Sequence, residues 1–142
     1  MIVGFNFTKL SAERKEAAKG KIDISKNIRI KYISEENLSL AKDKHNILKF
    51  KFEFTSKYEP AIGAILFEGE ILYLEDPKKV KELLNSWKKD KRLPKELTAG
   101  LFNTILTKCN VQALILSQEV NLPSPIPMPK VQMELSDKSY IG

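Results

Sequence analysis

Residues 48–54 read LKFKFEF, and this strict alternation of apolar and charged residues constrains the fold more than any other feature of the chain. In an extended strand, one side would carry all the apolar members, which are Leu48, Phe50, Phe52 and Phe54. Such a strand packs on one side and meets water on the other. Antiparallel sheets allow this arrangement, whereas parallel sheets are usually covered on both faces. The segment therefore predicts a half-buried strand of an antiparallel sheet.

Period-two alternation recurs through residues 1–75 and predicts four to five strands in all. The apolar residues of each predicted strand are expected to share one face, and these sets are Val3, Phe5 and Phe7; Ile22 and Ile24; Ile28, Ile30 and Tyr32; and Ile65, Phe67, Ile71 and Tyr73. Gly69 stands within the last set and predicts a β-bulge or a close approach of another part of the chain. Loops are expected at residues 36–46 and around Tyr58, Glu59 and Pro60.

The apolar period changes from two to about 3.6 at Asp76-Pro77, which predicts the start of a helix. Aspartate is a favourable N-cap, and proline suits the first helical turn because its missing N–H has no helical partner there. A single apolar stripe follows at helical spacing, made of Val80, Leu83, Leu84 and Trp87. We expect helices over about 77–91 and about 94–120, with a kink or division of the second helix at Asn110.

Residues 121–131 read NLPSPIPMPKV and place a proline at every second position directly after the second predicted helix. Each proline lacks an N–H donor, restricts its own backbone and disfavours helix in the residue before it. The P-x-P spacing differs from the P-x-x-P of SH3 ligands. We expect an extended strap that pins Leu122, Ile126 and Met128 onto apolar surface. The alternative is a docking edge for an extended client.

A chain of 142 residues suits a single domain over residues 1–142, with a strand-rich part at 1–75 followed by the two helices and the proline-rich segment. Four to five antiparallel strands followed by two helices on one face of the sheet form an α+β arrangement. The one cysteine, Cys109, excludes an internal disulfide and favours a reducing, cytoplasmic setting. No signal peptide and no run of roughly 20 apolar residues is found, so no membrane association is expected.

No group of residues in the sequence indicates a catalytic, metal or cofactor site. His45 is the one histidine and has no partner at catalytic or ligand spacing. Cys109 falls on the apolar stripe of the second helix, where a cysteine behaves as a small hydrophobe. Glu68 and Glu70 share a strand face, but a carboxylate pair needs a burying environment to act as acid and base, and a solvated face is the simpler interpretation. We therefore predict that the protein is not an enzyme and has no cofactor.

The net charge of +6 is concentrated in residues 78–95. Eight basic side chains lie there against two acidic ones, and they are Lys78, Lys79, Lys81, Lys88, Lys89, Lys91, Arg92 and Lys95. Such a segment can follow a phosphate backbone with salt-dependent affinity, or it can be the solvated face of an ordinary helix, which is the simpler interpretation. If nucleic acid is the partner, the residues expected to contact it are Lys88, Lys89, Lys91 and Arg92.

Two stretches and the order of the predicted elements resemble the SecB-type export chaperones. Phe7-Thr8-Lys9 is similar to the aromatic–Thr–Lys stretch that opens the family's first strand, and residues 109–125, CNVQALILSQEVNLPSP, are similar to its last helix and the proline-bearing segment after it. The chain also resembles small archaeal proteins that have been related to SecB. The resemblance implies a four-stranded antiparallel sheet with helices, association into dimers and a dimer of dimers, and a hydrophobic groove that holds unfolded polypeptide.

We therefore expect a SecB-like chaperone, a homo-oligomer (dimer or tetramer) that binds unfolded or non-native polypeptide without catalysis. Candidate binding residues come from a sheet face, a helical stripe and the proline strap, each with a core role as the alternative; they are Phe50, Phe52, Phe54, Leu83, Trp87, Ile126 and Met128. Bacterial members are acidic and meet the motor SecA through that surface, whereas this chain is basic, so the resemblance does not extend to a SecA handover. A nucleic-acid-binding module and an assembly subunit with one dedicated protein partner are the alternative functions.

Overall fold

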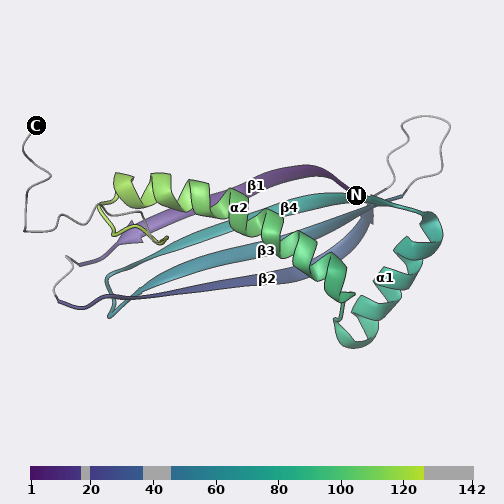
Figure 1. Cartoon of the computed structure of the whole chain (residues 1–142), viewed down its shortest axis with the longest axis horizontal. Coiled ribbons are helices and arrows are strands. Elements are labelled where there is room, and N and C mark those ends of the chain that lie inside the picture. The colour runs from purple at the N-terminus through teal and green to yellow at the C-terminus, as the bar shows by residue number, and fades with distance from the viewer. Residues whose placement is uncertain (17–19, 37–45, 127–142) are drawn as a thin grey trace, which may run out of the picture.

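A computed structural model describes residues 1–16, 20–36 and 46–126 of the chain (Figure 1). These residues form four strands and two helices, which are β1 (Ile2–Arg14), β2 (Asp23–Glu36), β3 (Asn46–Glu59), β4 (Gly63–Glu75), α1 (Pro77–Asp90) and α2 (Lys95–Glu119). The predicted α+β fold, an antiparallel sheet followed by two helices, is confirmed, with four strands in the sheet. Both helices end within one residue of the ranges predicted from the sequence.

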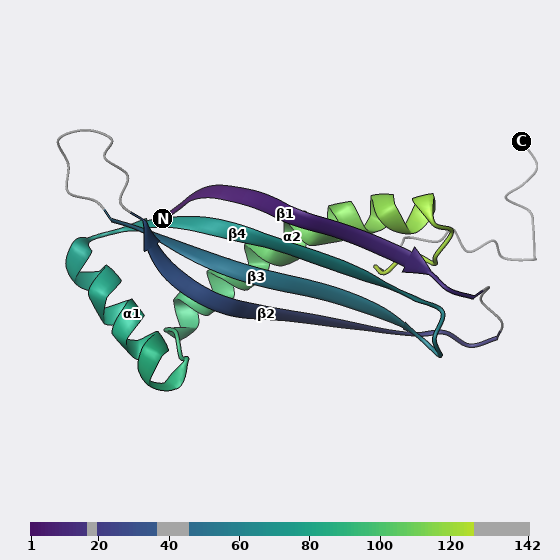
Figure 2. The ribbon, with the colours of Figure 1, turned by 180° about the vertical axis from the view of Figure 1, so that it is seen from behind.

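The strands form one antiparallel sheet in the order β1-β4-β3-β2, so the first two strands of the chain are its edges. Helix α2 runs diagonally across one face of this sheet, while α1 stands at the end of the sheet where β4 ends (Figure 1). No described helix lies over the other face, which we call the open face (Figure 2). The two helices therefore meet at an angle beside the sheet end, and this arrangement positions the candidate site.

The apolar core lies between α2 and the sheet face that it covers. Its fully buried side chains include Leu48, Phe50, Phe52, Phe54, Ile65, Phe67, Ile71, Val80, Leu101 and Ile105. On α2 the buried positions recur at every fourth residue from Leu101 to Ser117, which is one ridge of a helix. The predicted division at Asn110 is wrong, because α2 is continuous through that residue and the ridge packs on both sides of it, through Cys109 and Ala113.

Two of the predicted strand faces are wrong in part, because a β-bulge shifts the strand by one residue. In β1 the extra residue is Val3, whose side chain is 45% exposed and lies outside the core. In β2 it is Lys31, so that Tyr32 lies opposite Lys51 of the open face, with the Lys51 Nζ 4.9 Å from the ring centre. A bulge reverses the side on which the following side chains lie, and a period-two pattern cannot show it.

Gly69 lies where β1 and a phenylalanine ring come close to β4, as predicted. A Cβ at this position would be 2.6 Å from the Asn6 carbonyl oxygen and 2.6 Å from Phe52 Cζ. Phe7 pairs with Gly69 from β1, and the register of β1 shifts directly after Phe7. The close approach is thus present at Gly69, and a bulge lies in the neighbouring strand.

A Gly69→Ala variant is expected to lose about 1–3 kcal/mol of unfolding free energy, because the added methyl group overlaps the β1 backbone and forces it to shift. Gly100→Ala is the matched control, since a Cβ at Gly100 meets nothing within 4 Å. Alanine in that helix interior should raise the free energy of unfolding by about 0.5–1 kcal/mol. Urea denaturation followed by circular dichroism measures both, and equal effects would contradict the close approach at Gly69.

The segment after α2 lies against the body of the protein as far as it is described. Leu122 is buried, Ile126 is half-buried, and the Tyr58 hydroxyl donates a hydrogen bond to the Pro123 carbonyl oxygen at 2.8 Å. These contacts are those of a strap, while the later part of the predicted segment, Met128 included, lies outside the described residues. Tyr58 itself belongs to β3 and not to the predicted loop, since its ring is buried in the core.

Candidate functional site

Helix α1 has three faces, and each meets a different environment. Val80 and Leu84 pack against the core. A second face, at the helical spacing i, i+3, i+4 and i+7, lines a cavity with Lys79, Glu82, Leu83 and Ser86. The third face is exposed and carries Lys78, Lys81, Lys88 and Lys89.

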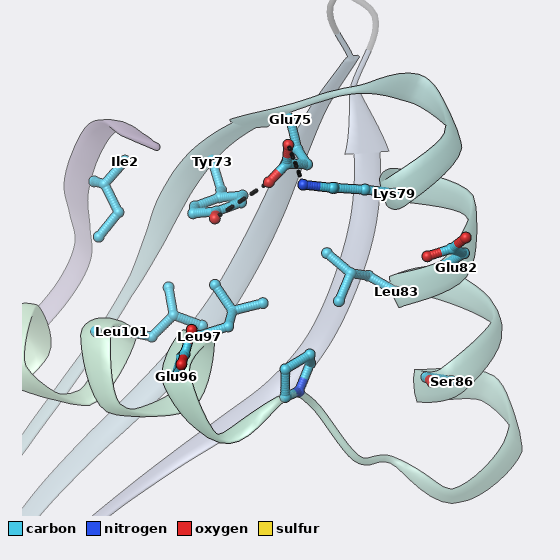
Figure 3. A pocket seen from close by; sticks show the side chains of 12 residues that line it. Ile2, Tyr73, Glu75, Lys79, Glu82, Leu83, Ser86, Glu96, Leu97 and Leu101 are labelled. Carbon is cyan, nitrogen blue, oxygen red and sulfur yellow. Dashed lines mark hydrogen bonds and ion pairs between the residues drawn. The ribbon is translucent and has the colours of Figure 1, made fainter.

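The cavity lies between α1, the start of α2 and the adjoining ends of β1 and β4 (Figure 3). Its volume is about 570 Å³, inside the range of about 300–1,000 Å³ that is usual for ligand sites. Apolar side chains from all four elements line it, namely Ile2, Tyr73, Leu83, Leu97 and Leu101. The remaining lining residues are Glu75, Lys79, Glu82, Ser86, Pro94, Glu96 and Gly100. The cavity is partly open to solvent, so the half-buried Leu83 and Leu97 are accessible from outside, whereas Leu101 is fully buried.

The turn between the helices creates this cavity. Lys91 takes a left-handed conformation, with φ of 53°, and caps α1, and Pro94 stands at the start of α2. The chain thus turns from α1 at the sheet end back onto the sheet face. Because the two helices diverge from the turn, neither covers the inner side of the other, and both Leu83 and Leu97 remain open to the space between them.

A row of polar side chains borders the cavity on the β4 side (Figure 3). The Tyr73 hydroxyl donates a hydrogen bond to a Glu75 carboxylate oxygen at 3.4 Å, and Lys79 Nζ lies 4.0 Å from the other oxygen. Burial, followed by the charge of Glu75, raises the pKa of Tyr73, so the phenol stays neutral at ordinary pH. The lining residues include no nucleophile bonded to a base, and the arrangement suits the binding of apolar groups.

The structure separates the predicted polypeptide-binding residues. Phe50, Phe52 and Phe54 have 0% exposure, so the sheet face that they form is core and offers no binding surface in this chain. The physical reason is that α2 lies over that face. Leu83 lines the cavity, whereas Trp87 is half-buried on the same helix and does not line it.

Sequence reasoning missed Ile2, Tyr73, Leu97 and Leu101 as parts of this cavity. Tyr73, Leu97 and Leu101 belong to apolar stripes, and such a stripe predicts core. Ile2 lies outside the apolar set predicted for its strand, and the bulge at Val3 brings it to the core side. No signal within either helix marked the cavity, since the spacing of a stripe does not show whether another element covers it.

The open face of the sheet carries ion pairs that join neighbouring strands. Lys31 Nζ lies 3.0 Å from a Glu68 carboxylate oxygen, and Lys49 lies 3.5 Å from Glu70. The hydrogen bond from Lys31 is the main cause that lowers the pKa of Glu68, so this carboxyl group stays ionised near neutral pH. Glu68 and Glu70 are therefore members of a salt-bridged, solvated face, and a raised pKa that would suit a general acid is not found at Glu68.

The remaining reactive side chains form no site in the described ranges. Cys109 is fully buried, as predicted, and burial raises the pKa of its thiol to about 12, which makes it a poor nucleophile. Residues 1–16, 20–36 and 46–126 contain no cluster of three or more His, Cys, Asp or Glu side chains that could hold a metal ion, and His45 lies outside these ranges. Neither described helix is long and apolar enough to span a membrane.

Comparison with known proteins gives a match at the level of the fold. The chain matches no protein-family model, and no curated protein matches it in sequence. Among solved structures it is similar to the Mycobacterium tuberculosis Rv1957 SecB-like chaperone, in complex with a ChAD peptide from the Rv1956 HigA1 antitoxin. The TM-score is 0.51 and the identity 13%, over 95% of this chain and 92% of that chain. The chain therefore has a SecB-like fold over nearly its whole length, without support from sequence.

Proposed function

We propose that the chain is a SecB-like chaperone that holds unfolded or non-native polypeptide in an apolar groove, without catalysis. The observation that carries the proposal is the open cavity of about 570 Å³, which apolar side chains line beside a fully buried core. A protein that holds non-native chains needs apolar surface that it does not cover itself. The SecB-like fold agrees with this, and the peptide in the Rv1957 complex supports polypeptide as the class of partner.

In this proposal, apolar side chains of a client enter between α1 and α2 and contact Leu83 and Leu97, which are half-buried. These two side chains come from two helices that diverge, so an extended segment can lie between the helices with its side chains directed into the cavity. Further apolar surface for a client or a second copy is offered by Val111 and Ile115 of α2, which are 57% and 48% exposed. We expect the protein to work as a homo-oligomer, a dimer or a tetramer.

The purified protein is expected to suppress aggregation of several unrelated, chemically denatured enzymes at near-stoichiometric amounts and without ATP, as followed by light scattering. Suppression arises because bound clients no longer expose apolar surface to one another. Sedimentation velocity in the same buffer gives the oligomeric state. Absence of suppression by folded, oligomeric protein would contradict the proposal, and suppression restricted to one client out of many would favour an assembly subunit with a dedicated partner.

A further inference from the structure

The cations of α1 and of the turn after it are clustered along the chain, and they differ in their surroundings from the paired cations of the open face. On the open face, Arg29 and Lys31 lie within 3.5 Å of a glutamate oxygen, and Lys49 is paired with two glutamates. Within residues 78–95, by contrast, Lys79 alone has a carboxylate oxygen of a described residue within 4.0 Å. Unpaired like charges so close in the chain repel one another and lower stability unless external anions gather beside them.

These unpaired cations form one surface, which we call the basic face. It consists of Lys78, Lys81, Lys88 and Lys89 on α1, continued by Lys91, Arg92 and Lys95 in and after the turn, all of them exposed. Helix α1 has 14 residues and is therefore about 21 Å long. None of the seven side chains lines the cavity, so the basic face and the cavity occupy different sides of the same helix.

We infer that the basic face binds the phosphodiester backbone of nucleic acid without reading its sequence. A backbone supplies anions at regular intervals along a chain, and lysine binds phosphate as a point charge. Sequence is read mainly by contacts to base edges, whereas backbone contacts carry no sequence information. Trp87, the one aromatic residue of this segment on which a base could stack, is half-buried, so binding through the phosphates is what the face offers. Because the cavity lies on another side of α1, both surfaces can be occupied together.

Two other kinds of partner fit the basic face less well. A helix that lies on an anionic membrane inserts apolar side chains beside its basic ones, but Val80 and Leu84 of α1 are packed into the protein core. A stable protein interface is enriched in aromatic side chains and arginine and depleted in lysine, whereas six of the seven residues here are lysine. Nucleic acid is thus the partner that both the charge and the composition of the face favour.

Fluorescence anisotropy with labelled oligo-U and oligo-A RNA tests the inference on the intact protein. Both RNAs are expected to bind with similar affinity. The logarithm of the association constant should fall with the logarithm of salt concentration with a slope of about −3 to −5, since each of four to seven neutralised phosphates contributes about 0.7. The combined variant Lys88→Gln, Lys89→Gln, Lys91→Gln and Arg92→Gln should bind at least about 10-fold more weakly in low salt, with a slope smaller by about 3.

The matched control removes four other exposed lysines that form no ion pair with a described residue, through Lys21→Gln, Lys26→Gln, Lys57→Gln and Lys108→Gln. Its net charge equals that of the first variant, and its affinity for RNA should stay within a factor of about 3. An equal loss in both variants, or binding to anionic vesicles or poly-glutamate in place of RNA, would overturn the inference. Both variants should still suppress aggregation, so the proposed chaperone function is tested separately.

Discussion

A Phe52→Ala variant is expected to lose about 3–5 kcal/mol of unfolding free energy, the cost of removing a large buried side chain and leaving a cavity. Phe52 is 0% exposed, and its ring centre lies 5.2 Å from that of Phe5 and 6.4 Å from that of Phe7. The tip of the ring also fills the space over Gly69. The strands around it are held in register by their backbone hydrogen bonds, so they cannot collapse into the space. Urea denaturation at one fixed protein concentration measures the loss.

Val111→Ala is the control for this prediction, because it removes apolar atoms from a side chain that is 57% exposed. Its effect should stay within about 0.5 kcal/mol. If the alanine variant at Phe52 does not fold, Phe52→Leu keeps the site measurable, with an expected loss of roughly 1–2 kcal/mol. A loss below about 1 kcal/mol for Phe52→Ala would contradict a closed core under α2. The sheet face of Phe52 would then again be a candidate surface for polypeptide binding.

A Gly100→Trp variant is expected to lose most of its ability to hold clients while keeping its fold. Gly100 lines the cavity of about 570 Å³, and a Cβ at this position meets no atom within 4 Å, so we expect an indole ring attached there to occupy part of the cavity. Tryptophan has a higher helix propensity than glycine, so the stability of α2 should not fall. The concentration needed for half-maximal suppression of aggregation should rise at least about 10-fold, equal to about 1.4 kcal/mol of binding free energy.

Ala99→Trp provides the matched control, since it adds the same side chain at the neighbouring exposed position, which does not line the cavity. This variant is expected to suppress aggregation as well as the unchanged protein does. Circular dichroism and sedimentation velocity show that fold and assembly are retained. Full suppression by Gly100→Trp would exclude the cavity as the binding site, and an equal loss in both variants would attribute the effect to added apolar surface on α2.

Local sequence patterns predicted the secondary structure well where the pattern depends on one strand or helix alone. The strand through LKFKFEF and the helix that begins at Asp76-Pro77 were predicted because spacing along one element sets which side is apolar. Val3 and Tyr32 were assigned to the wrong side because a bulge depends on how a strand pairs with its neighbour. The sequence of either strand alone does not show which residue is the extra, unpaired residue of the bulge.

The candidate site was predicted only in part. Leu83 was named from the sequence, and it does line the cavity, but Leu97 and Tyr73 were not. The sequence predicted the basic face, since the charges of residues 78–95 lie close together along the chain. The sequence could not show that these cations lack carboxylate partners among the described residues. Ion pairs depend on which elements lie side by side, as those of the open face do, since they join different strands.

The sequence by itself determined the fold class, the ends of the helices and the concentration of positive charge, because each depends on residues that are neighbours in the chain. Only the tertiary structure decided which apolar stripe is core and which is open. Phe52 and Leu83 both belong to regular apolar stripes, yet one is sealed and the other is accessible. The physical reason is that α2 covers the sheet face of Phe52, whereas α1 stands at the sheet end and diverges from α2, so Leu83 has no complete cover.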